Sequence, residues 1–115
     1  MTHIKMNELE EILEQADGLK ISLSIVQLVT KYGIPGEMLN GKYIPATREI
    51  LLNPCQSQSE LGITFLHELY HDWATQNNRF GSRNLEEYHA EAYAQEMYEL
   101  YHNEINQYLI DRKLS

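Results

Sequence analysis

The residues best suited to chemistry lie in one segment, residues 64–74, whose sequence is TFLHELYHDWA. His67 and His71 are four residues apart, so on a helix their side chains share one face, one turn apart. Two imidazoles at this spacing can occupy two corners of a tetrahedral zinc site. Glu68, rotated by about 100° around the helix axis, can lie beside the metal without binding it. The pattern His-Glu-x-x-His is typical of metalloproteases.

The chemistry that this pattern predicts is hydrolysis of a peptide bond. Zinc lowers the pKa of a bound water toward neutrality. Glu68 would take a proton from that water as a general base and then deliver it to the leaving amine. The simpler alternative is that His67 and His71 are surface residues on an acidic helix.

A catalytic zinc ion needs a third protein ligand and an open fourth position. The segment EEYHAEAYA, residues 86–94, offers Glu87 and Glu91, four residues apart on one face of a helix. The small residues Ala90 and Ala94 would let this helix pack closely against the histidine helix. One carboxylate could then reach the metal, while the other holds a ligand histidine in its orientation.

We expect Glu87 to be the third ligand, with His89 and Glu91 as alternatives. His89 lies about 200° from Glu87 around the helix, so the two cannot both face the metal. Asn84-x-x-Glu87 also fits a capping box, in which Glu87 would only cap its own helix. Glu86 and Glu91 could equally be solvated surface charges.

Three tyrosines near these segments could stabilise the negatively charged oxygen of a tetrahedral intermediate. They are Tyr70, Tyr88 and Tyr93. The alternative is that they pack in the core or at an interface, with the ring buried and the hydroxyl group at the solvent-exposed edge.

Hydrophobic spacing and turn residues predict the elements that carry these motifs. Ser57-x-x-Glu60 has the form of a capping box, so the histidine helix should begin near residue 58 and end near residue 75 or 76. The other expected elements are helices over residues 6–16, 19–32 and 84–111, a loop over residues 33–41, and a hairpin that pairs Tyr43 and Ile44 with residues 50–52. The β-branched residues in 19–32 also allow a strand there. This order predicts a compact α+β fold, with residues 1–115 as one domain.

The composition limits the functional classes. The chain has 115 residues, a formal net charge of −8 and one cysteine, Cys55. The negative charge argues against direct contact with a nucleic-acid backbone, and it allows a basic protein partner. No apolar run approaches the roughly 20 residues of a membrane span, and the N-terminal segment lacks a signal-peptide core. We therefore expect a cytoplasmic protein.

Three motifs, in order, resemble those of the ImmA/IrrE family of zinc metallopeptidases. They are REILLNP at the end of the hairpin, TFLHELYH on the histidine helix, and EEYHAEAYA, which is similar to Glu-x-x-Ala-(Asp/Asn/Glu)-x-(Phe/Tyr)-Ala. The resemblance covers roughly residues 40–98. The Leu-Met-Pro sequence that often follows the third-ligand helix in this family is absent here, where the helix continues as QEMYELYHNEINQYL.

The resemblance implies a small zincin-like fold, with His67, His71 and Glu87 as zinc ligands and Glu68 as the catalytic acid and base. Glu91 falls where related enzymes have an Asp or Asn that holds a ligand. Family members typically cleave a repressor that controls a mobile element or a stress response, so the implied substrate is a transcriptional regulator. The chain resembles a minimal catalytic core of the size found in phages. An edge strand, KYIP or EILLN, could pair with an extended substrate.

Two other functions fit the same residues. The chain could be a binding protein, such as an inhibitor or antirepressor, that keeps a zincin fold without catalysis. It could also be an inactive peptidase fold whose tyrosine-rich last helix forms a subunit interface.

Overall fold

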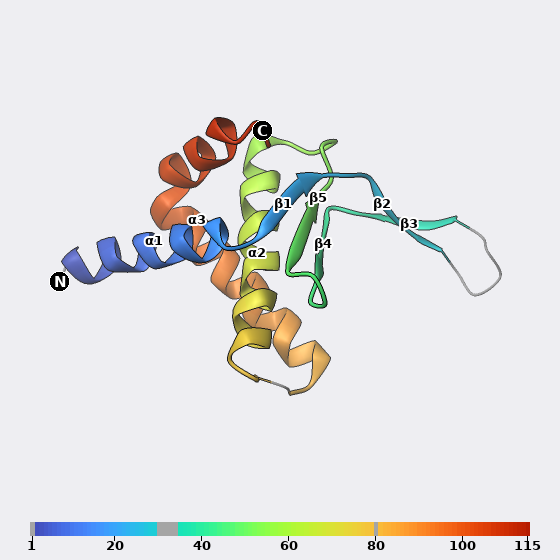
Figure 1. Cartoon of the computed structure of the whole chain (residues 1–115), viewed down its shortest axis with the longest axis horizontal. Coiled ribbons are helices and arrows are strands. Elements are labelled where there is room, and N and C mark those ends of the chain that lie inside the picture. Colours follow the sequence, from blue (N-terminus) through green and yellow to red (C-terminus); the bar gives the residue numbers. More distant parts are fainter. Residues whose placement is uncertain (1, 30–34, 80) are drawn as a thin grey trace.

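Three helices and five short strands form an α+β structure in the part of the chain that the computed structural model describes, residues 2–29, 35–79 and 81–115 (Figure 1). In chain order the elements are α1 (Thr2–Asp17), β1 (Lys20–Leu23), β2 (Val26–Val29), β3 (Pro35–Leu39), β4 (Gly41–Ile44), β5 (Glu49–Leu52), α2 (Gln58–Gln76) and α3 (Arg83–Asp111). Within the described residues, none of the helices is both long enough and apolar enough to cross a membrane.

The strands β1, β5 and β4 form a sheet in that order, with β5 in the centre. β1 runs parallel to β5 and β4 runs antiparallel to it, so β4 lies at an edge. Of the two segments considered as an edge strand, KYIP therefore contributes the edge, and EILLN does not. Alternate residues of a strand face the same side, and Ile50 and Leu52 of β5 are fully buried against the helices. β2 and β3 form a separate antiparallel ribbon that extends away from the helices (Figure 1).

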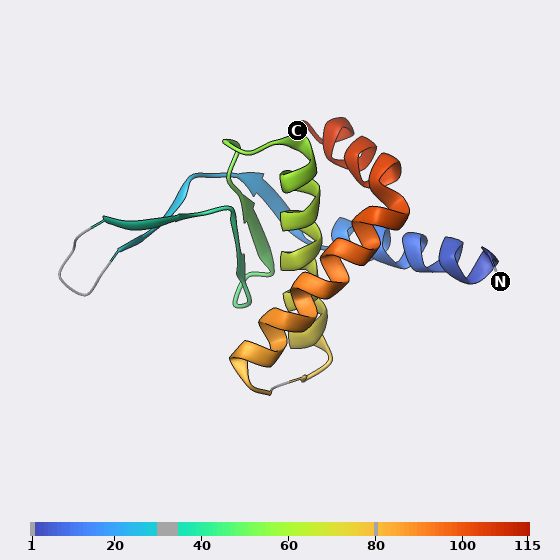
Figure 2. The same cartoon turned by 180° about the vertical axis from the view of Figure 1, so that it is seen from behind.

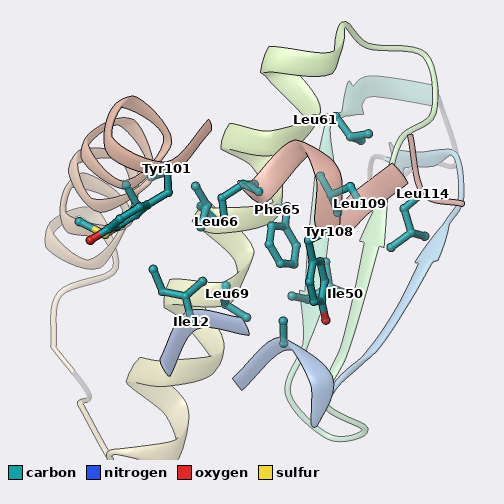
Figure 3. Close-up of a cluster of buried hydrophobic side chains, with 14 of the residues drawn as sticks. Ile12, Ile50, Leu61, Phe65, Leu66, Leu69, Tyr101, Tyr108, Leu109 and Leu114 are labelled. Carbon is teal, nitrogen blue, oxygen red and sulfur yellow. The ribbon is translucent and has the colours of Figure 1, made fainter. Parts of the chain in front are cut away.

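The central helix is α2, which lies between the sheet and α3 and contacts both (Figures 1 and 2). Its apolar face carries Phe65, Leu66 and Leu69, which are fully buried in one cluster with Ile50 of β5 and Leu109 of α3 (Figure 3). Full burial of a side chain of this size contributes about 1.5–3 kcal/mol. This face therefore fixes the rotation of α2 about its own axis and leaves its polar face turned away from the core.

The helices α2 and α3 approach each other closely. A Cβ atom at Gly62 of α2 would lie only 2.4 Å from Cε1 of Tyr98 on α3, so a larger residue does not fit there without movement. The Tyr98 hydroxyl is itself held by Asn106, to which it donates a hydrogen bond of 3.1 Å. Nearer the start of α3, Ala90 and Ala94 are fully buried. Small residues on both helices thus allow the short separation.

Asp72 of α2, which is fully buried, joins this helix to α1 and to the sheet. It accepts hydrogen bonds from Gln15 of α1 at 2.9 Å, from the Tyr43 hydroxyl of β4 at 2.7 Å, and from Nε and Nη2 of Arg48 at 3.0 Å. Burial alone would raise the pKa of Asp72, but these hydrogen bonds together hold the pKa below its usual value. The ionised carboxylate therefore fixes the hairpin of β4 and β5 against α2, one residue after His71.

The structure corrects the helix expected over residues 19–32. Lys20–Leu23 and Val26–Val29 are strands, so α1 is the one N-terminal helix in the described part of the chain, and residues 30–32 lie outside that part. β-Branched residues such as Ile21 of β1 favour strands. Pairing of β1 with β5, which is distant in the sequence, adds stabilisation that local helix propensity does not include.

The loop expected over residues 33–41 is also wrong where it is described, because Pro35–Leu39 form β3 and β4 begins at Gly41. The remaining elements are confirmed. α1 includes residues 6–16, the hairpin is formed by β4 and β5, and α2 and α3 end at or near the expected positions. The capping box of α2 is present, with Glu60 N–H donating to Ser57 Oγ at 3.2 Å and Ser57 N–H donating to the Glu60 carboxylate at 2.9 Å.

We predict that Asp72→Ala lowers the free energy of unfolding by about 3 kcal/mol, because Arg48 and Tyr43 lose their buried acceptor. Urea denaturation followed by circular dichroism measures this change. The control is Glu10→Ala, at an exposed position of α1, which should cost less than about 0.5 kcal/mol. Similar small losses in both variants would show that the Asp72 hydrogen bonds do not anchor α2.

Candidate metal centre

The polar face of α2 meets the first turns of α3. α3 runs back along α2 in the opposite direction (Figure 2), so early residues of α3 lie beside late residues of α2. The capping box sets where α2 begins, and the buried apolar face sets its rotation. Together these features direct His67 and His71 toward α3 as neighbouring rings, with centroids 5.0 Å apart.

Both histidines face one carboxylate, Glu87 of α3. Nε2 of His67 lies 3.1 Å from Oε2 of Glu87, and Nε2 of His71 lies 2.9 Å from Oε1 of the same residue. One ligand atom from each of the three residues can be chosen so that all lie within 4.8 Å of one another. The structure therefore brings the three residues expected to bind zinc to one point, although they are up to 20 positions apart in the sequence.

The other nitrogen of each histidine ring is held by its own carboxylate. Nδ1 of His67 lies 3.1 Å from Oε2 of Glu91, and Nδ1 of His71 lies 2.6 Å from Oε2 of Glu86. A ring whose Nδ1–H donates to a carboxylate presents the lone pair of Nε2, which is the form that binds a metal. Glu91 lies where it was expected to hold a ligand. Glu86 was expected at most to be a surface charge, and sequence reasoning missed its contact with His71.

The donor set fits a zinc ion. Zinc binds imidazole nitrogen and carboxylate oxygen at about 2.0–2.2 Å in a tetrahedral arrangement, for which the distance between two ligand atoms is roughly 3.3 Å. The Nε2 atoms of His67 and His71 lie 3.1 and 2.9 Å from different oxygens of Glu87. One ligand atom from each residue lies within 4.8 Å of the other two, so the three side chains need only small movements to reach one ion. Two histidines and one carboxylate leave the fourth position for water or substrate, as in catalytic zinc sites.

Glu68 lies beside the histidines and faces the edge strand β4. Burial raises the pKa of its carboxyl group, and this effect outweighs the nearby histidines, which lower the pKa. A backbone hydrogen bond from Tyr43 holds the carboxylate against β4. Gly41 allows this approach, because a Cβ there would lie 2.5 Å from Cγ2 of Thr64 and 3.5 Å from Cγ of Glu68. A carboxyl group with a raised pKa is suited to accept a proton near neutral pH.

An open cleft runs between β4 and the histidines. It consists of two cavities of about 420 and 780 Å³. Gly41 of β4 lines both cavities, and so do His67, Glu68 and Glu87. The candidate base and two of the candidate ligands therefore face one solvent-accessible space, next to the edge of the sheet.

The capping alternative for Glu87 is wrong. α3 begins at Arg83, with Ser82 as the N-cap residue, so Asn84 already lies inside the helix and is not the cap. His89 is also not at the histidines. Its ring lies against Tyr88, with centroids 5.6 Å apart.

The three tyrosines considered as oxyanion stabilisers lie elsewhere. Tyr70 and Tyr93 pack together, with ring centroids 5.5 Å apart, along a different cavity. Tyr88 is 68% exposed to solvent. These positions give the prediction of an oxyanion role no support, and packing roles fit Tyr70 and Tyr93 better.

Comparisons of the chain with protein-family models, with curated proteins and with solved structures give no match. Function must therefore be inferred from the geometry of the residues themselves.

We predict that the purified protein binds about one zinc ion per chain, and that His67→Ala, His71→Ala and Glu87→Ala each lose most of it, because each removes one ligand. His89→Ala should keep the metal and serves as the control. Elemental analysis after gel filtration measures the metal, and circular dichroism checks folding. Full zinc content in folded Glu87→Ala would contradict the ligand set.

The carboxylates that hold the rings give a second prediction. Glu86→Gln and Glu91→Gln should each weaken zinc binding by about 10–100-fold, because a neutral amide holds Nδ1–H less strongly. Competition with a chelator of known affinity measures the dissociation constant. Glu96→Gln, at an exposed position of α3, is the control for the change in charge. Equal affinities in all three variants would show that neither carboxylate supports its histidine.

Proposed function

We propose that this chain is a zinc-dependent endopeptidase. The observation that carries the proposal is the convergence of His67 and His71 on the two oxygens of Glu87, with Glu68 beside them in an open cleft. The resemblance to the ImmA/IrrE family adds support, because its three motifs lie on β5, α2 and α3. The motifs on α2 and α3 contain the residues that meet, His67, His71 and Glu87. On this basis the fold is a small zincin-like one.

Each residue has a distinct part in the proposed reaction. His67, His71 and Glu87 would hold a zinc ion, which would supply a Lewis acid and lower the pKa of water to near 7. Glu68 takes the proton of the attacking water and passes it to the amine that leaves. Burial supports this role of Glu68, because the raised pKa of its carboxyl group lets it hold the proton between the two steps.

The edge strand β4 is proposed to bind the substrate. Within the described residues β4 pairs with β5 alone among the strands. Apart from the Tyr43 N–H, which donates to Glu68, its other edge has backbone groups that an extended peptide can pair with. This edge borders the cleft that contains Glu68 and the histidines. A peptide bound there would have its backbone beside the general base, which favours a protein substrate over a small molecule.

The substrate is proposed to be a regulatory protein, such as a transcriptional repressor, in the cytoplasm. This class follows from the family resemblance. An extended segment of such a protein is the form that can add to the edge of a sheet. Binding of nucleic acid is not part of the proposal, since the chain carries a net charge of −8.

The test is Glu68→Gln. This variant should keep its fold and its zinc, and it should cleave peptides at least about 100-fold more slowly, because it lacks the general base. A peptide library digested with the zinc-loaded protein and analysed by mass spectrometry provides the readout. Glu96→Gln, at an exposed position of α3 outside the cleft, is the control for the change in charge.

Two results would contradict the peptidase. One is an unchanged cleavage rate in the zinc-loaded Glu68→Gln protein. The other is that the zinc-loaded wild type cleaves no peptide of the library, which would favour a binding protein.

A further inference from the structure

A separate cavity, of about 480 Å³, lies among residues of α1, α2 and α3. Its lining includes Tyr70 and Trp73 of α2, Tyr93 of α3, and Glu8 and Glu11 of α1. Among the described residues, it shares none of its lining with the cleft at the candidate metal centre. An inference about this cavity therefore does not depend on the proposed peptidase.

Aromatic side chains form one wall of the cavity. The ring of Tyr70 lies 5.5 Å from the ring of Trp73 and 5.5 Å from the ring of Tyr93, measured between centroids. Trp73 is 40% exposed, which is unusual for so large an apolar side chain. Its ring already attracts one cation, because the guanidinium of Arg79 lies 5.6 Å from the ring centroid. An aromatic wall of this kind suits cation–π contact.

Carboxylates give the cavity a negative charge. In the described part of the chain, neither Glu8 nor Glu11 forms an ion pair with a cationic side chain. The charges of Asp72 and Arg48, which also line the cavity, offset each other through an ion pair of 3.0 Å. Within the described residues, these two carboxylates have no paired cation, so a cation is the charge that the cavity favours.

We propose that this cavity binds a lysine or arginine side chain presented by a basic segment of a partner protein. The aromatic rings would contact the face or the alkyl part of the side chain, and Glu8 and Glu11 would pair with its charge. The volume falls within the roughly 300–1,000 Å³ of ligand sites, which leaves room for more than one side chain. The net charge of −8 would also speed the approach of a basic partner.

The test uses the fluorescence of Trp73, the chain's one tryptophan, which lines this cavity and also a neighbouring one beside Arg79. The variants below assign a change to this cavity. The probe is an acetylated and amidated peptide of alternating arginine and glycine, titrated at low ionic strength. We expect a saturable change in fluorescence, and we expect none with the corresponding glutamate–glycine peptide. Tetramethylammonium chloride is titrated in parallel, to distinguish a site for a small amine from one for a protein side chain.

A matched pair of variants assigns the binding to the cavity. The double variant Glu8→Gln, Glu11→Gln should bind the arginine peptide about tenfold more weakly. The control is Glu10→Gln, Glu14→Gln, which removes the same charge from exposed positions of the same helix and should leave the affinity unchanged. The proposal is overturned if the arginine peptide gives no saturable change in fluorescence, including the case in which tetramethylammonium gives such a change and the peptide does not. It is also overturned if both double variants weaken binding of the arginine peptide equally.

Discussion

The close packing of α3 on α2 is the constraint on which the candidate site depends. Gly62 admits the ring of Tyr98, and the buried residues Ala90 and Ala94 keep the helices close near the start of α3. Because α3 runs antiparallel to α2, this packing places Glu87 between the two histidines. A larger separation would lengthen the distances from the Glu87 oxygens to the two rings, and catalytic sites lose activity after displacements of about 1 Å.

The site gathers groups that repel one another. Four carboxylates, those of Glu68, Glu86, Glu87 and Glu91, lie at or beside two histidines in one cleft. Like charges at short range destabilise a fold unless a counter-charge offsets them. The buried cluster on the other face of α2 and the hydrogen bonds of Asp72 hold the helix in place. A divalent cation would offset the remaining repulsion, which links metal binding to the stability of the fold.

Sequence reasoning located the elements whose formation depends on local signals. The capping box at Ser57 fixed the start of α2, and helical spacing placed His67 and His71 on one face. The helix predicted over residues 19–32 is wrong, because β1 and β2 lie there. A short strand is stabilised by its partner, and the partner of β1 is β5, almost 30 residues away in the sequence. The wrong cap for α3 came from a competing pattern. Asn84-x-x-Glu87 has the spacing of a capping box, but Ser82 is the N-cap residue.

The contact of Glu86 shows a limit of reasoning from one helix at a time. Glu86 precedes Glu87 and points about 100° away from it around α3, so spacing alone did not place both at the histidines. They reach the same site because α3 crosses the end of α2, where His71 meets Glu86 on one nitrogen and Glu87 on the other. The one signal in the sequence for the Glu86 contact is the presence of a second histidine ligand. Each ligand histidine usually donates its other ring N–H to a separate acceptor, so two histidines call for two such acceptors.

The most direct test of the metal centre is diffraction at the zinc absorption edge from crystals of the zinc-loaded protein. An anomalous peak is expected about 2.0–2.2 Å from Nε2 of His67, from Nε2 of His71 and from a carboxylate oxygen of Glu87. A peak bound by other residues, or zinc-loaded crystals with no ordered peak, would contradict a metal centre at this place.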